Sequence, residues 1–175
     1  MPPSYPASPY LIIRALREGD RDPVVELLWE LNRYEADLDP LIQPFAAEDR
    51  DRSYAAAVAC LDKDLERAAE HEGALLVAER GGAVVGFLCF IVETAYPFVR
   101  PEMRAYGYVA DLVVADGERG RGIGTRLLAE AERLTRERHL CRLSIAVLHG
   151  NDGAARAYER FGFRPHSTEL TKTLD

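Results

Sequence analysis

The apolar positions of this chain follow two kinds of spacing. Short apolar segments at 10–16, 74–93 and 106–115 are rich in β-branched and aromatic residues, which is typical of strands. At about 48–71 and 122–138, apolar residues instead recur every three or four positions, as on one face of a helix. The pattern therefore predicts that helices and strands are interspersed along the chain.

The remaining segments complete the predicted order β-α-α-β-β-β-α-β-α-β. Asp22 is expected to cap the first helix, with Pro23 at its first position. "RGG" at 80–82 predicts a hairpin turn, and Gly162 predicts the end of a short helix that starts at Asn151.

Two further strands are expected near the C-terminus, at 141–148 and, partly exposed, at 165–174. Antiparallel hairpins followed by a β-α-β crossover predict a mixed sheet in the α/β or α+β class.

Length and charge restrict the function classes. We expect one domain over 10–175, preceded by a flexible, proline-rich arm at 1–9. The net charge of -7 argues against a general nucleic-acid binder. The start of the chain lacks a secretory pattern, and no apolar run is long enough to cross a bilayer, so no membrane partner and a cytoplasmic location are expected. The cysteines at 60, 89 and 141 are expected to be buried, reduced thiols without metal.

The segment "DGERGRGIGTRLL" at 116–128 concentrates glycine and positive charge in an acidic chain. It lies between a predicted strand and a predicted helix, so its first helical N–H groups have no internal partner and favour an anion. Arg119, Arg121 and Arg126 add full charges. The segment lacks the lysine of a P-loop, and Thr125 replaces the last glycine of a dinucleotide-binding loop.

This segment resembles the acetyl-CoA signature of the GCN5-related N-acetyltransferases (GNAT), [RQ]-x-x-G-x-[GA], at Arg119, Gly122 and Gly124. A second segment, "NDGAARAYERFGF" at 151–163, matches the family's following motif, and the order of elements agrees from about residue 10 onward. The resemblance implies a GNAT-like fold with a central mixed sheet of about six to seven strands and about four flanking helices. It also implies transfer of an acetyl group from acetyl-CoA to a primary amine by direct attack, without metal.

The resemblance also implies roles for individual residues. Coenzyme A would be bound by the β-strand end and the glycine loop, with Asn151 and Tyr158 from the second motif. The implied binding residues of the strand and loop are Leu112, Val113, Val114, Arg119, Gly120, Arg121, Gly122, Ile123, Gly124 and Thr125. Tyr158 would protonate the leaving thiolate, although it also fits a buried helical stripe. Asn151 fits a helix cap equally well.

The general base is not defined by the motif. Many relatives have a glutamate where this chain has Ala110, and others have an acid at the position of Tyr108. Asp111 is the acid that remains in this strand, and it is a candidate base, substrate anchor or structural hydrogen-bonding group. Water relayed from Asp111 or Tyr108 is the alternative.

The acceptor would be a small-molecule or peptide amine bound by the first helix pair and the 94–105 loop. The candidate contacts are Trp29, Tyr34, Glu35, Glu93, Tyr96 and Phe98. The missing glutamate leaves a non-catalytic acyl-CoA sensor as an alternative, and transfer of longer acyl groups as a third. Since relatives often dimerise, the resemblance is also compatible with a homodimer.

Overall fold

A five-stranded mixed sheet organises the chain. The computed structural model describes residues 10–39, 41–42 and 49–174, and the sheet has the strand order β1-β2-β3-β4-β5. Neighbouring strands are antiparallel from β1 to β4, whereas β4 and β5 are parallel. The strands are β1 (Leu11–Ala15), β2 (Ala74–Arg80), β3 (Ala83–Thr94), β4 (Ala105–Val114) and β5 (Leu143–Ile145).

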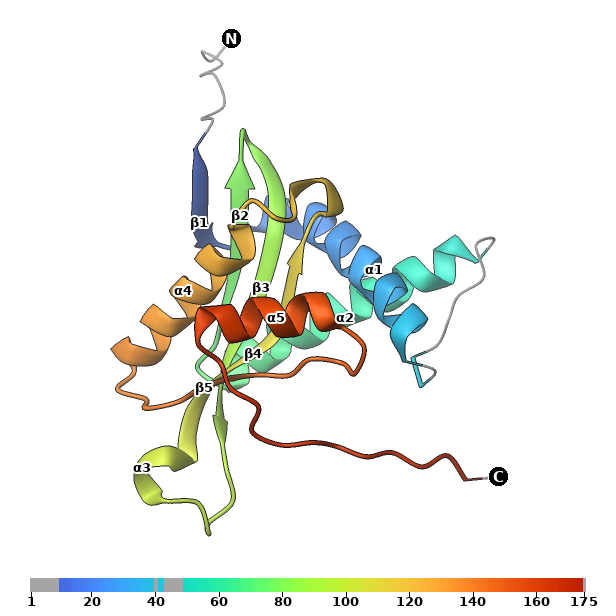
Figure 1. Cartoon of the computed structure of the whole chain (residues 1–175). Coiled ribbons are helices and arrows are strands. Elements are labelled where there is room, and N and C mark those ends of the chain that lie inside the picture. The colour runs from blue at the N-terminus through green and yellow to red at the C-terminus, as the bar shows by residue number, and fades with distance from the viewer. Residues whose placement is uncertain (1–9, 40, 43–48, 175) are drawn as a thin grey trace.

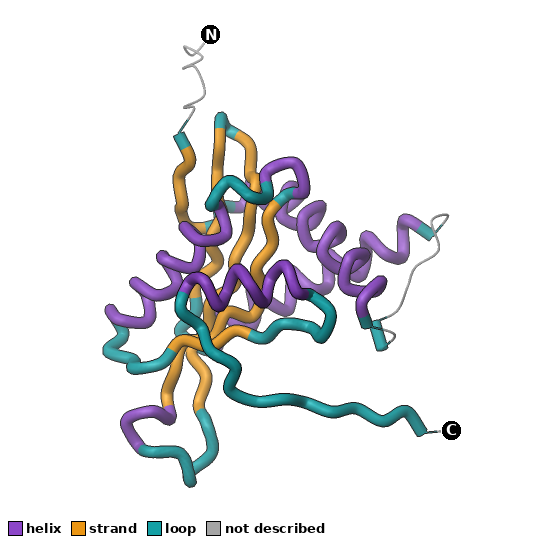
Figure 2. The backbone as a smooth tube through the Cα atoms, in the orientation of Figure 1, coloured by secondary structure: helices purple, strands orange, loops and turns teal. Residues whose placement is uncertain are grey.

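Helices cover both faces of this sheet (Figures 1 and 2). In Figure 1, α1 and α2 lie behind the strands, while α4 and α5 cross in front of them. Two short 3₁₀ helices, η1 (Glu18–Asp20) and η2 (Asp116–Glu118), precede α1 and α4. The α-helices are α1 (Arg21–Leu38), α2 (Arg50–Glu70), α3 (Pro101–Arg104), α4 (Ile123–Glu137) and α5 (Asp152–Phe161).

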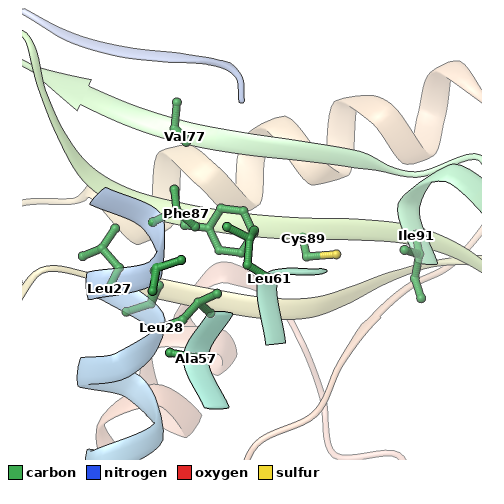
Figure 3. Close-up of a cluster of buried hydrophobic side chains, with 11 residues drawn as sticks. Leu27, Leu28, Ala57, Leu61, Val77, Phe87, Cys89 and Ile91 are labelled. Atoms are coloured by element: carbon green, nitrogen blue, oxygen red, sulfur yellow. The ribbon is translucent and has the colours of Figure 1, made fainter. Parts of the chain in front are cut away.

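The two faces of the sheet enclose separate apolar clusters. Behind the sheet, Leu28 of α1 and Leu61 of α2 pack on Phe87 of β3, and all three are almost completely buried (Figure 3). In front, Leu127 of α4 packs with Phe90, and the ring of Tyr158 joins this cluster from α5. Each buried side chain of this size contributes about 1.5–3 kcal/mol, so these clusters fix the helices on the sheet.

The mixed sheet and the hairpin at Gly81 and Gly82 are confirmed. Among the described residues five strands form rather than six or seven. The expected strand at 165–174 is wrong, because these residues form no strand through 174 and are exposed. A segment with an alternating pattern forms a strand only where a neighbouring strand offers an edge for pairing. β5 has three residues and is shorter than the expected strand 141–148, so it offers a shorter edge than predicted.

Two local predictions are corrected. The residue preceding α1 is Asp20 rather than Asp22, and its buried carboxylate accepts hydrogen bonds from Arg14 of β1, at 2.6 and 2.8 Å. Arg14 lies six positions before Asp20, in the preceding strand, so a helix-capping pattern does not include this contact. All three cysteines are free, but only Cys89 is buried as predicted: Cys60 is partly buried, and Cys141 is exposed because it precedes the shortened β5.

Candidate active site

The glycine loop places a row of backbone N–H groups at the start of α4. Gly122 precedes the helix with φ +77°, and no side chain caps this end. The amides of Ile123, Gly124 and Thr125 therefore have no intrahelical acceptor. A Cβ at Gly120 or Gly122 would meet no atom within 4 Å, so the space beside these amides is open to a ligand.

The arginines of this loop contribute less free charge than the sequence indicates. Arg119 lies 3.2 Å from Asp116, and its Nε donates to the Val114 carbonyl oxygen at 3.1 Å. Arg121 lies 3.7 Å from Glu118. Nearby carboxylates therefore offset the charges of Arg119 and Arg121. The donors without a partner in this loop are the backbone N–H groups at the start of α4.

Arg126 lies on a different side of α4, where it lines a surface groove with residues of β1. This position is beside the first strand of the sheet rather than among the loop arginines.

Beyond Val109, β4 has a free edge on the side of β5. The parallel pairing covers Gly107 to Val109 of β4 and Leu143 to Ile145 of β5, and the chain after Ile145 is no longer a strand. Residues 111–114 of β4 therefore pair with β3 but not with β5, and Ala110 pairs with neither strand. We call this divergence of β4 and β5 the fork. Its unpaired backbone edge leads directly to the glycine loop, and it contains the predicted contacts Leu112, Val113 and Val114.

A β-bulge in β4 sets the direction of the predicted base. Cys89 of β3 pairs with Asp111, but the next residue, Phe90, pairs with Val109, so Ala110 is an extra residue in the ladder. The bulge places Ala110 and Asp111 in succession on the face covered by α1 and α2. A simple alternating pattern would have placed them on opposite faces.

On that face Asp111 meets a second carboxyl, which the sequence motifs do not include. Asp64 of α2 is 3% exposed, and its carboxyl lies within hydrogen-bonding range of the side chains of Asp111 and Cys89. Its Oδ2 atom finds no N–H or O–H donor among the described residues. One signal was available in the sequence: Asp64 falls between Leu61 and Ala68 on the apolar stripe of α2.

This environment favours the protonated forms of the buried groups. Burial, followed by the charge of Asp64, raises the pKa of Asp111 to about 8. Burial also raises the pKa of Asp64, despite opposing interactions that include the charges of Arg67 and Lys63. The same effect raises the pKa values of the Cys89 thiol and the Tyr108 hydroxyl, so Tyr108 stays neutral at physiological pH.

The second motif lies in α5 and the loop before it. Burial raises the pKa of Tyr158 to about 12, and the charge of Glu35 on α1 adds to this effect. Glu35 is itself half-buried, its pKa is raised by burial, and its charge also acts on Asp111. Glu35 therefore lies within electrostatic reach of the candidate acid and of the candidate base.

Asn151 caps α5, as one of its two predicted roles required. Its Oδ1 accepts a hydrogen bond from the Ala154 amide at 3.1 Å and another from the Tyr34 hydroxyl at 3.4 Å. The guanidinium of Arg119 lies 5.8 Å from the Tyr34 ring. Tyr34 thus connects the start of α5 to the glycine loop, and the fold brings the two sequence motifs together.

The candidate acceptor contacts separate into different environments. Trp29 links α1 and α2, since its indole N–H donates to Ser53 at 2.8 Å. Glu93 lies 3.5 Å from Arg67, whose charge also acts on Asp111. Tyr96 and Phe98 stack on each other in an exposed loop, with 5.7 Å between ring centroids.

A surface hollow of about 420 Å³ lies between α1 and α2, lined by Glu26, Arg50 and Tyr54 among others, and it includes none of the predicted catalytic residues. Within the described ranges, no three His, Cys, Asp or Glu side chains are grouped to hold a metal ion. Among the helices in those ranges, none combines the length and apolar character needed to span a membrane.

Comparison with known proteins gives an independent view of this arrangement. The model of the Acetyltransferase (GNAT) family matches residues 24–163. An N-alpha-acetyltransferase of Sulfurisphaera tokodaii is 29% identical over 103 residues, which cover 57% of this chain and 62% of that protein. A glucosamine 6-phosphate N-acetyltransferase of Trypanosoma brucei brucei is 27% identical over 104 residues, covering 54% of this chain and 69% of that protein.

Among solved structures, the aminoglycoside N-acetyltransferase AAC(6')-Iy, in complex with the bisubstrate analogue CoA-S-monomethyl-acetylneamine, matches with a TM-score of 0.65. The match covers 95% of this chain and 99% of that one at 15% identity, so it supports the fold alone. The described structure thus shares its fold with an acetyltransferase.

Proposed function

Because the chain belongs to the Acetyltransferase (GNAT) family, we propose that it transfers the acetyl group of acetyl-CoA to a primary amine. One observation carries this proposal: the unpartnered amides at the start of α4 continue directly from the unpaired edge of β4. A diphosphate attached to a peptide-like arm has donors and acceptors that match these two features in the same order.

The glycine loop would hold the diphosphate of the coenzyme. The space beside Gly120 and Gly122 is open, and Arg119 and Arg121 can exchange their carboxylate partners for phosphate oxygens. Residues 112–114 would pair with the pantetheine arm through their backbone groups, as an added strand does. An N–H of Val113 or Val114 would stabilise the developing negative charge on the thioester oxygen.

Acetyl-CoA supplies the acyl group as a thioester, and the protein supplies position and proton transfer. Tyr158 would donate to the departing sulfur, since its raised pKa keeps the hydroxyl protonated well above neutral pH. Because a tyrosinate is more basic than a thiolate, whose pKa is about 8.5, Tyr158 would complete the transfer by taking a proton from the acylated nitrogen. Asp111 would accept the first proton from the incoming ammonium.

The charge around the fork favours a cationic acceptor. The negative charges of Asp64 and Glu35 both raise the pKa of Asp111, in addition to the effect of burial. An ammonium group entering beside Asp111 would relieve this repulsion. We therefore propose a small amine that is positively charged at neutral pH, which agrees with the sugar amines named for two of the matched proteins.

Release of free thiol from acetyl-CoA in the presence of a panel of amines tests the proposal. We expect release with at least one cationic amine, and slower release with Tyr158→Phe. Coenzyme binding without thiol release for every amine, and with acetyl and longer acyl donors alike, would instead favour the acyl-CoA sensor. This second function is considered because Ala110 supplies no carboxylate to act as a general base.

A further inference from the structure

Among the described residues, no arginine or lysine forms an ion pair with either carboxyl group behind the fork, although Arg67 and Lys63 act on Asp64 at longer range. Asp64 is 3% exposed and lies within hydrogen-bonding range of Asp111, yet its Oδ2 atom has no N–H or O–H donor among the described residues. Two ionised carboxylates in hydrogen-bonding contact repel each other strongly in a buried site. A proton between them removes this repulsion and gives the unpartnered oxygen a bond.

We propose that Asp64 and Asp111 share one proton in the resting protein, and that Asp64 is thereby the positioning residue that makes Asp111 an effective proton acceptor. This inference rests on the proposed acetyl transfer. It adds to that function a residue, Asp64, that neither sequence motif contains.

The surroundings of the pair come from four elements. On α2, Arg67 and Lys63 are the cations near Asp64, and Arg67 also lies 3.5 Å from Glu93 of β3. The other groups that face the pair are Cys89 of β3, Cys60 of α2, Glu35 of α1 and Tyr108 of β4. The two thiols and the tyrosine are neutral at pH 7, because burial raises the pKa of each. Glu35 adds negative charge, which strengthens retention of the shared proton.

The shared proton matters because the acceptor amine is a weak acid. A lysine-like ammonium has a pKa of about 10.4, so an ordinary aspartate with a pKa near 3.9 takes its proton with an equilibrium constant of only about 10⁻⁶ to 10⁻⁷. Raising the pKa of Asp111 to about 8 improves this equilibrium by about four powers of ten. Efficient general bases have pKa values near the working pH, which this value meets.

The proton balance of the reaction is then complete. The resting pair first loses its shared proton to solvent. The doubly ionised pair then takes one proton from the ammonium, as an N–H bond breaks and an O–H bond forms on Asp111. The nitrogen lone pair forms the new C–N bond while the C–S bond breaks. Of the remaining two protons, one stays on the amide nitrogen and the other reaches the sulfur through Tyr158. The pair returns its proton to solvent.

The test measures the carboxyl groups and the reaction separately. In protein labelled with ¹³C at the aspartate carboxyls, we expect Asp64 and Asp111 to titrate as a coupled pair, with an upper step near pH 8. Asp64→Asn should move the remaining step of Asp111 downward by about one unit or more. It should not reach the usual aspartate value, since burial is the larger cause of the shift. Circular dichroism verifies that each variant is folded.

The same variants are then compared by the pH dependence of kcat/KM for an accepted amine. The wild-type profile should rise through a step near pH 8, and Asp64→Asn should shift this step to lower pH and lower the maximal rate. Asp111→Asn should abolish the step. Asp62→Asn is the matched control on α2, since Asp62 is exposed and paired with Arg21, and it should leave the profile unchanged.

Each result decides the inference. Independent titration of both carboxyls near pH 4 would overturn the shared proton. Coupled titration together with an unchanged profile in Asp64→Asn would overturn the role of Asp64 in proton transfer. If the carboxyls titrate as a pair but no amine is acetylated, the shared proton stands, while the proposed function and the catalytic role fail together.

Discussion

Replacing Asp111 by asparagine should stabilise the fold at alkaline pH while it removes activity. In the folded protein the pKa of Asp111 is about 8, against an ordinary value of 3.8. The unfolded chain therefore loses this proton near pH 4 and the folded chain near pH 8. Between these values the folded state binds more protons, so the free energy of unfolding falls as pH rises. Asparagine has no proton to lose and keeps a similar shape.

The pKa difference sets the size of the effect. About four pKa units at 1.36 kcal/mol each give about 6 kcal/mol as an upper limit at pH 8 and above. Water and neighbouring side chains reorganise around a buried charge, so we expect a measured difference of about 2–4 kcal/mol. At pH 4 and below, where both states hold the proton, the two proteins should have nearly equal stability.

Urea denaturation at pH 5 and at pH 8.5 measures this difference directly. Wild type should lose stability relative to Asp111→Asn between these two pH values, and Asp62→Asn should follow wild type. Parallel pH dependence in wild type and Asp111→Asn would refute the reasoning, because it would mean that Asp111 ionises in the folded protein as it does in the unfolded chain.

Three further variants test the other parts of the site. Gly122→Val should destabilise the fold by about 1–2 kcal/mol, because φ at this position is +77°, and it should abolish coenzyme binding measured by calorimetry. The control Gly81→Val introduces similar backbone strain at φ +60° and should retain coenzyme binding. Tyr158→Phe should keep the ring contact with Phe163 and lower kcat by about 10- to 100-fold, with little change in coenzyme affinity. An equal loss of coenzyme affinity in steady-state kinetics would argue against Tyr158 as the proton donor to the leaving sulfur. Asn151→Ala should cost about 1 kcal/mol in thermal unfolding through loss of the α5 cap, whereas Asn151→Ser should restore most of it; equal stability of the two variants would show that the cap contributes little.

Local sequence patterns were sufficient for the parts of the site that local geometry determines. The glycine loop, the start of α4 and the cap at Asn151 follow from residue types within a few positions of one another. The buried stripe of α4 was predicted for the same reason, since a helical period defines which residues share a face.

The remaining features depend on contacts between distant residues. The bulge at Ala110 is a property of the β3–β4 register, and no alternating pattern specifies where a ladder gains a residue. Asp64 lies 47 positions before Asp111 and meets it only after α2 packs on the sheet. The absence of a strand at 165–174 also depends on a distant contact. Its alternating pattern is typical of an edge strand, but the three-residue β5 does not provide the edge with which it would pair.

Calorimetric titration of coenzyme A into the folded protein tests whether the amides at the start of α4 bind its diphosphate. We expect saturable binding at one site per chain, which Gly122→Val removes and Gly81→Val preserves. Absence of measurable binding by the well-folded wild-type protein, or equal binding by Gly122→Val, would contradict the assignment of the α4 amides to the diphosphate.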